Sequence, residues 1–139
     1  MINRRMGYIV KDQDPLLMRG SETIQQACKA MRDRHVGSVL VVDEREHLIG
    51  IFTGRDAVKL LAKGQGGNVA LADAMTPDPV TTTPDHKAIE ALRAMSDGGF
   101  RHVPVVERGR IWGIVSRADF KGVEIDRLDE EEGLAERIR

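Results

Sequence analysis

GIFTGRD (residues 50–56) reappears as GIVSRAD (residues 113–119), 63 positions later in the chain. Upstream of each motif, SVLVV (residues 38–42) corresponds to HVPVV (residues 102–106) at a spacing of 64. The second copy therefore lacks one residue in the connection between its two apolar runs. A repeat of this length predicts two supersecondary modules that pack on each other, because neither half alone can bury enough apolar surface. We therefore expect functional residues at the seam between the copies.

The composition argues against several classes of protein. With 139 residues, 41% of them hydrophobic and 31% charged, the chain has the size and composition of one soluble globular domain. Its formal net charge of -1 argues against a broad interface with nucleic acid or an acidic membrane, which would need a basic face. No apolar stretch after Arg4-Arg5 has the length of a signal peptide, and none could span a bilayer. The single cysteine, Cys28, cannot form an internal disulfide, so the chain suits a reducing cytoplasm.

Each copy contains one predicted amphipathic helix. The stripe residues follow the spacing i, i+3, i+4 and i+7, and they are Ile24, Ala27, Cys28 and Met31 in the first copy and Ala88, Ala91, Leu92 and Met95 in the second. Ser21 and Asp85 precede these stripes and are suitable N-cap residues. We therefore expect the two helices to begin near residues 22 and 86.

β-branched runs predict the strands. Each copy is expected to have a short first strand, a central strand and a return strand, at residues 16–17, 38–42 and 48–52 in the first copy and 80–83, 102–106 and 111–115 in the second. Thr53 and Ser116 follow the return strands and should cap a second helix in each copy. Each unit then has the order strand, helix, strand, strand, helix.

These elements divide the chain into four segments. We predict a first unit at residues 9–63, a linker at 64–72, a second unit at 73–122 and an acidic tail at 123–139. The glycines of the linker do not form a dinucleotide-binding loop, because the third glycine of that pattern would fall at Val69. The tail has few apolar residues among its acidic ones, so we expect a solvated helix or a frayed end.

In this order and spacing, the motifs resemble those of a tandem pair of cystathionine β-synthase (CBS) domains, the Bateman module, over about residues 9–122. The segments that carry the resemblance are residues 50–56, 78–81, 101–106 and 113–119. The resemblance implies an α/β (α+β) fold in which two pseudo-symmetric β-α-β-β-α units pack through their sheets. It also implies clefts between the repeats that bind AMP, ADP, ATP or S-adenosylmethionine, and a disc-like homodimer of two modules.

Two aspartates are the candidate ribose ligands. Asp56 and Asp119 lie three residues after Thr53 and Ser116, whose helix-opening amides would favour a phosphate. A carboxylate in that first turn can accept hydrogen bonds from both ribose hydroxyls, and the resemblance implies this contact. The spacing Ser/Thr-x-x-Asp also fits a capping box, in which the acid binds the amide of its own cap residue. The spacing alone leaves both interpretations open.

The candidate phosphate ligands are Arg101 and His102, at the start of the second copy's central strand, and Arg55 in the first copy. The residues equivalent to Arg101 and His102 are Gly37 and Ser38, so we expect the two clefts to bind ligand unequally. Alternatives are a solvated Arg101, a His102 paired with backbone, and an Arg55 paired with a neighbouring acid. The candidates for an adenine pocket are Val80, Thr81, Pro104 and Ser38.

No catalytic pattern accompanies these sites. The four histidines have no metal-ligand spacing, and the chain has no Walker loop or nucleophile elbow. We therefore expect that the chain binds neither a metal nor a catalytic cofactor. We expect a sensor and not an enzyme: the chain binds an adenosyl ligand and signals to an effector protein. The alternative is a structural dimerisation or adaptor domain with vestigial clefts. A nucleic-acid-binding regulator lacks a recognition motif.

Overall fold

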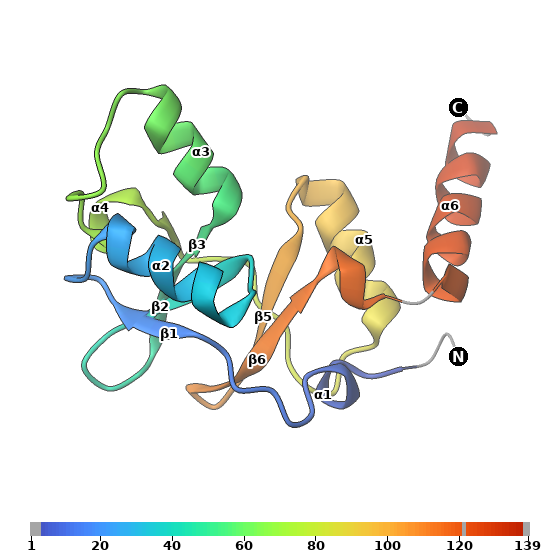
Figure 1. The fold of residues 1–139 in the computed structure, drawn as a ribbon. Coiled ribbons are helices and arrows are strands. Elements are labelled where there is room, and N and C mark those ends of the chain that lie inside the picture. Colours follow the sequence, from blue (N-terminus) through green and yellow to red (C-terminus); the bar gives the residue numbers. More distant parts are fainter. Residues whose placement is uncertain (1–3, 121, 138–139) are drawn as a thin grey trace. The chain divides into compact units, whose positions relative to one another are not determined.

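The computed structural model describes residues 4–120 and 122–137, and these residues form two compact units (Figure 1). The first-repeat unit consists of Asp14–Val80 and the hairpin tip Arg108–Ile111. The second-repeat unit consists of the described parts of Met1–Gln13, Thr81–Glu107 and Trp112–Arg139. Each sequence repeat thus forms the body of one unit, but the N-terminal segment belongs to the unit of the second repeat.

The first-repeat unit is a four-stranded sheet with helices. Its elements are β1 (Leu17–Arg19), α2 (Ile24–Arg34), β2 (Ser38–Val42), β3 (Leu48–Thr53), α3 (Gly54–Ala62), α4 (Leu71–Ala74) and β4 (Thr76–Pro77). The strand order is β1-β2-β3-β4, with β1 and β2 parallel and the other pairs antiparallel. All five residues of β2 are buried, as the continuous apolar run of this central strand requires.

The second-repeat unit contains a two-stranded sheet. Its elements are α1 (Met6–Ile9), α5 (Ala88–Gly98), β5 (His102–Glu107), β6 (Arg110–Ser116), the 3-10 turn η1 (Arg117–Asp119) and α6 (Gly122–Arg137). Thr82 forms an isolated parallel bridge with Val105. The equivalent residues of the first repeat, 64 positions earlier, are Met18 and Val41, and they pair in the parallel strands β1 and β2. The predicted second helix after Ser116 is wrong, since η1 is a single turn that ends before the buried Phe120.

The predicted helix starts were two residues too early. Thr23, not Ser21, caps α2: its Oγ1 accepts a hydrogen bond from the Gln26 amide (3.2 Å), and Gln26 Oε1 accepts one from the Thr23 amide (2.8 Å). This reciprocal pair satisfies amides that a helix cannot satisfy internally. In the second repeat Lys87, not Asp85, precedes the first residue of α5.

The short helix that precedes each repeat packs in the unit of the other repeat. The Met6 amide of α1 donates to the carbonyl of His86 (2.9 Å), and the Leu71 amide of α4 donates to the carbonyl of Glu22 (2.8 Å). His86 and Glu22 are equivalent positions, 64 residues apart. Met6 and Leu71 are both fully buried in the core of the unit that receives them. The two repeats have therefore exchanged their leading helices.

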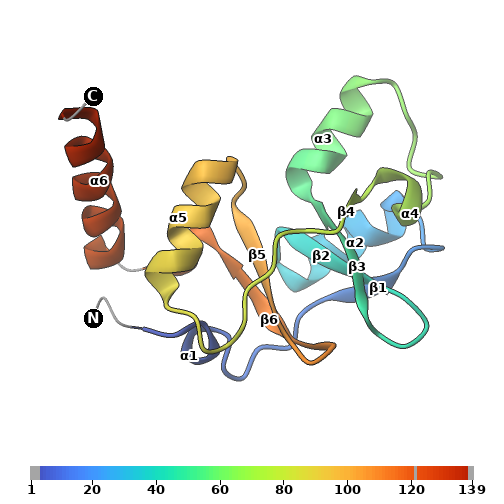
Figure 2. The ribbon, with the colours of Figure 1, turned by 180° about the vertical axis from the view of Figure 1, so that it is seen from behind.

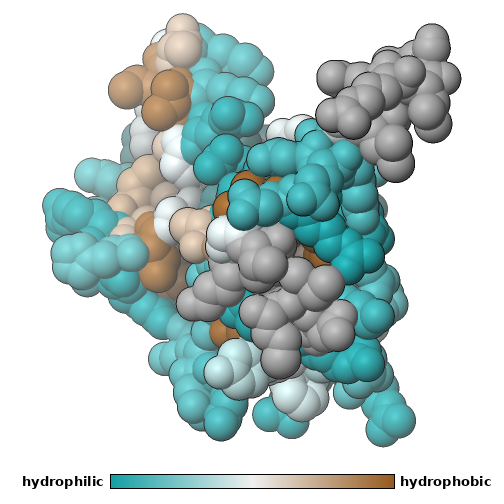
Figure 3. Space-filling view, turned by 90° about the vertical axis from the view of Figure 1, so that its right-hand side faces the viewer, coloured by the Kyte–Doolittle hydropathy of each residue, from teal (hydrophilic) through white to brown (hydrophobic). Residues whose placement is uncertain are grey.

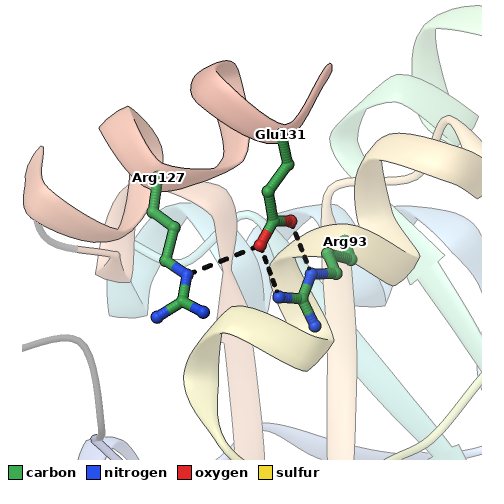
Figure 4. A network of polar contacts seen from close by, with 3 residues as sticks. All are labelled: Arg93, Arg127 and Glu131. Atoms are coloured by element: carbon green, nitrogen blue, oxygen red, sulfur yellow. Dashed lines mark hydrogen bonds and ion pairs between the residues drawn. The ribbon is translucent and has the colours of Figure 1, made fainter. Parts of the chain in front are cut away.

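Helix α6 packs against α5 through one buried side chain and a charged network (Figures 2 and 4). Leu128 lies in the core of the second-repeat unit. Arg93 donates two hydrogen bonds to the Glu131 carboxylate (2.8 and 2.7 Å), and Ser96 Oγ donates to Glu132 Oε1 (2.6 Å). The bonds from Arg93 hold the pKa of Glu131 below its ordinary value, so the carboxylate stays ionised at neutral pH.

The packing of α6 differs from the solvated or frayed tail that the sequence predicts for residues 123–139. Its apolar residues were too sparse to indicate a stripe, but Leu128 is buried in the core and the partly buried Ile125 packs against it. Residues 138–139 of the predicted tail lie outside the described residues.

Candidate functional site

Three segments of the second-repeat unit are tied together by backbone hydrogen bonds. The Thr82 amide donates to the Pro104 carbonyl (2.9 Å), and the Val106 amide donates to the Thr82 carbonyl (2.8 Å). Just before the first residue of β5, the Arg101 carbonyl accepts a hydrogen bond from the Arg117 amide (3.0 Å). The segment around Thr82, the start of β5 and the turn η1 therefore form one backbone framework, and most of the predicted ligand residues of the second repeat lie on it.

Asp119 lies in η1 with its carboxylate partly buried. Its Oδ2 accepts hydrogen bonds from the amide (2.7 Å) and the hydroxyl (3.2 Å) of Ser116. The capping interpretation of Ser116-x-x-Asp119 is thus confirmed. Both bonds use the same oxygen, and an ionised carboxylate has two oxygens with about four acceptor sites. The cap therefore leaves the carboxylate with the capacity to accept hydrogen bonds from a ligand.

The other predicted residues of this repeat differ in exposure. Arg101 and Thr81 are exposed, His102 is half-buried, and Pro104 is buried. Val80 is 53% exposed and belongs to the first-repeat unit, whereas Thr81, the next residue, belongs to the second-repeat unit. The unit thus brings Arg101 and Asp119 onto adjoining turns of one framework.

The first-repeat unit has the same backbone arrangement around Asp56. Its Oδ2 accepts hydrogen bonds from the amide (2.9 Å) and hydroxyl (3.1 Å) of Thr53. The Gly54 amide donates to the Gly37 carbonyl (3.1 Å), which repeats the bond from Arg117 to Arg101. Ser38 is buried and pairs with Thr53 in the sheet, and Arg55 is exposed on α3. The predicted helix that follows Thr53 is confirmed.

The two units differ in the cations near these turns. Arg101 occupies the position of Gly37, so only the second repeat has a charged side chain at that point of its framework. In addition, Arg4 Nη2 donates to the backbone carbonyl of Asp119 (3.0 Å), a contact between residues 115 positions apart. No local pattern of residues indicates this contact, because Arg4 lies outside both repeats as the motifs define them.

An apolar groove runs between α2 and α3 in the first-repeat unit. It has a volume of about 390 Å³, and Ile24, Cys28, Ala57, Leu60 and Leu61 form much of its wall. Cys28 is half-buried there, and burial raises the pKa of its thiol. Leu61 on the rim is 77% exposed, and Val58 on the same helix is 67% exposed. Figure 3 shows hydrophobic atoms gathered over α3 at the top of that view, while hydrophilic residues cover most of the other coloured surface.

Residues 4–120 and 122–137 contain no group of three or more histidine, cysteine or acidic side chains that could hold a metal ion. None of the helices they form is long and apolar enough to cross a membrane.

The family model of the CBS domain matches residues 9–63 and 71–125. The 17.7 kDa protein of the bps2 3' region of Acidianus ambivalens is 33% identical over 111 residues, which cover 79% of this chain and 67% of that protein. Other relatives are longer: the chain covers only 40% of protein MJ1225 of Methanocaldococcus jannaschii, with 28% identity.

Two solved structures illustrate the likeness in fold. The CBS domain pair of protein MJ0100, in complex with 5'-methylthioadenosine and S-adenosyl-L-methionine, is 26% identical and has a TM-score of 0.78, over 94% of this chain and 98% of that chain. Protein PAE2072 of Pyrobaculum aerophilum, complexed with AMP, is 19% identical and has a TM-score of 0.82, over 91% and 98% of the two chains. At that identity, the second likeness concerns the fold alone.

Proposed function

The chain belongs to the CBS domain family, with one domain in each repeat, and on this premise we propose that it is a regulatory module that binds an adenosyl ligand. The ligand classes are AMP, ADP, ATP and S-adenosylmethionine, and the sites lie in clefts between the repeats. Ligand binding changes the conformation of the module and so signals to an effector protein. The module acts in the cytoplasm and catalyses no reaction.

One observation carries this proposal: in the second-repeat unit, a single backbone bond of 3.0 Å links the residue that bears a cationic side chain, Arg101, to the turn that bears the Asp119 carboxylate. A nucleotide needs both kinds of group, because its ribose hydroxyls donate to a carboxylate and its phosphate oxygens accept from a guanidinium. Ser116 and Asp119 then bind the ribose, and Arg101 and His102 bind the phosphate. The complex of MJ0100 with two adenosyl compounds supports this ligand class.

In the first repeat, the corresponding ligand residues are Thr53 and Asp56 for ribose and Arg55 for phosphate. Arg55 is the second residue of α3, and its side chain is exposed. It is the cation that we assign to this site. Thr81 and Pro104, together with Val80 and Ser38, contribute to the adenine pockets. Because Gly37 replaces Arg101 here, we propose that this site binds a phosphorylated ligand more weakly.

Native mass spectrometry of the freshly purified chain, followed by calorimetry with AMP, ADP, ATP and S-adenosylmethionine, tests this function. We expect retained or added adenosyl ligand. If none of the four compounds binds, the chain is instead a structural dimerisation or adaptor domain whose clefts are vestigial.

Replacing Arg101 with alanine should weaken AMP binding by about 1.5–3 kcal/mol, the range for a hydrogen bond to a charged group, while adenosine loses little affinity. The contrast follows from the phosphate, which only AMP carries. Calorimetry with both compounds measures it, and Ser38→Ala in the first repeat serves as the control with a smaller effect. Equal losses for AMP and adenosine would show that Arg101 acts through the fold and not through a phosphate.

We also propose that two copies of the chain form a twofold dimer. The apolar groove between α2 and α3, with Leu61 on its rim, and the exposed Val58 on the same helix α3 supply a surface that a second copy would cover. Sedimentation at micromolar concentration should therefore give a dimer, and Leu61→Arg should shift the equilibrium towards monomer. Lys63→Ala, at the exposed C-cap of the same helix, is the matched control. A monomer with and without ligand would contradict this proposal.

A further inference from the structure

Arg4 contacts two elements of the second-repeat unit at once. Its backbone carbonyl accepts a hydrogen bond from the amide of Ala88, the first residue of α5 (2.7 Å). Its guanidinium donates from Nη2 to the backbone carbonyl of Asp119, the last residue of η1 (3.0 Å). A single residue thus connects the start of a core helix to the turn that presents the candidate ribose ligand.

The first repeat has an equivalent of the backbone contact but no side chain that could make the contact with the turn. Val69 occupies the position equivalent to Arg4, and its carbonyl accepts from the amide of Ile24, the first residue of α2 (2.9 Å). The side chain of valine has no donor, so it cannot hold the turn that contains Asp56. The backbone contact therefore belongs to the exchange of leading helices, whereas the guanidinium contact is particular to the turn of Asp119.

The segment that carries Arg4 is anchored along its length. Met6 is fully buried, and the Gly7 amide donates to the Pro84 carbonyl (3.0 Å). Further along, the Gln13 side chain pairs with the backbone of Ile114 in β6: its Nε2 donates to the carbonyl and its Oε1 accepts from the amide, both at 3.0 Å. The guanidinium is thus presented from a fixed segment rather than from a free end of chain.

The end of the turn η1 is held by contacts from outside the turn, among them the buried Phe120 that follows it and Arg4. The turn comprises three residues, and the carbonyls at the end of such a short turn have no partner within it. The contact from Arg4 satisfies the carbonyl of Asp119 itself. Since the backbone and side chain of one residue move together, a shift of this carbonyl would displace the carboxylate that must meet both ribose hydroxyls.

We propose that Arg4 is a positioning residue for the adenosyl site of the second repeat, and that it acts by holding the Asp119 carbonyl. This inference rests on the proposed function for the identity of the ligand. The ordering of η1 by Arg4 can be measured without any ligand.

Hydrogen exchange of the full-length chain supplies that ligand-free measurement. In Arg4→Ala, the amides of residues 116–120 should exchange about threefold to tenfold faster, as expected when a turn loses one hydrogen bond. The matched control is Arg5→Ala, because Arg5 lies on the same segment but donates to the carbonyl of Asp85. The control should leave exchange at residues 116–120 unchanged. Equal exchange in both variants and the unsubstituted chain would overturn the inference.

Calorimetry with AMP supplies the second measurement. Arg4→Ala should lower the affinity for AMP by about threefold to tenfold, whereas Arg5→Ala should bind AMP like the unsubstituted chain. Arg4→Lys, which keeps a donor, should recover most of the affinity lost in Arg4→Ala. Unchanged AMP affinity in Arg4→Ala, or an equal loss in Arg5→Ala, overturns the inference. If the unsubstituted chain binds no AMP, the proposed function fails for this ligand, and hydrogen exchange alone decides whether Arg4 orders the turn. If Arg4→Ala does not fold, Arg4→Met, whose long side chain also has no N–H donor, replaces it in both measurements.

Discussion

Asp119→Glu is expected to weaken AMP binding by about 1–3 kcal/mol while leaving the free energy of unfolding within about 0.5 kcal/mol. Glutamate is the usual acid of a capping box, so the longer side chain can still accept from Ser116 as Asp119 Oδ2 does at 2.7 and 3.2 Å. The added methylene nevertheless moves the carboxylate away from the ribose hydroxyls by more than a hydrogen bond tolerates. Thermal unfolding without ligand and calorimetry with AMP separate the two effects.

The matched control for this prediction is Asp56→Glu, which makes the same change at the cap of Thr53 in the weaker site. We expect a smaller loss of AMP affinity from it. If AMP affinity is unchanged in Asp119→Glu and Asp119→Ala lowers only stability, then the aspartate is a helix cap and nothing more.

Met6→Ala is expected to lower the free energy of unfolding by about 2–5 kcal/mol, the range for truncating a large buried side chain in a core that cannot collapse around the cavity. Met6 is fully buried in the core of the second-repeat unit, although it precedes the first repeat in sequence. Tyr8→Ala is the control on the same short helix, because Tyr8 is 68% exposed, and it should change stability by less than about 0.5 kcal/mol. Denaturant unfolding measures both.

Leu71→Ala tests the other half of the exchange. Leu71 is fully buried in the first-repeat unit and should show a loss of the same order as Met6. If Met6→Ala were as mild as Tyr8→Ala, the leading helix α1 would not be an integral part of the second-repeat core.

The central and return strands were predictable because their signal is local, whereas the strand predicted at residues 80–83 is wrong: only Thr82 forms an isolated bridge there. The strand Ser38–Val42 has the bounds that the sequence predicts, since a strand buried on both faces is apolar along most of its length, as residues 39–42 are here. The return strands were also found, with one residue added at one or both ends. Repetition strengthened each assignment, because two copies with the same pattern restrict the fold more than one copy does.

Contacts between distant segments were not predictable. Ser21 and Asp85 looked like caps because their side chains suit that role, but the first amides of α2 and α5 bind the carbonyls of Val69 and Arg4. Those carbonyls come from the exchanged leading helices, and nothing in the local pattern indicates them. Likewise, Leu128 and Ile125 are too few among the acidic residues of α6 to form a stripe that would mark a core helix.

In the candidate site, too, the contacts within one turn had a signal in the local sequence, and the contact between distant segments had none. The spacing of Thr53 with Asp56 and of Ser116 with Asp119 indicated the hydrogen bonds within each turn as one of two interpretations, and the structure shows these bonds. The resemblance to a family supplied the ligand class, and no pattern of residues pointed to Arg4. Its contact with Asp119 depends on the register of a segment more than a hundred positions away.

The exchange of leading helices also sets an order in which the chain can fold during synthesis. Residues 14–80 emerge consecutively and include α4, so the body of the first-repeat unit can form before most of the second repeat has been made. The second-repeat unit must instead wait with α1 unpaired, since Gln13 and Ile114 are 101 positions apart. A folded first repeat shortens the effective loop between them and so lowers the entropic cost of closing it. We therefore expect the first repeat to fold first and α1 to pack on the second repeat afterwards.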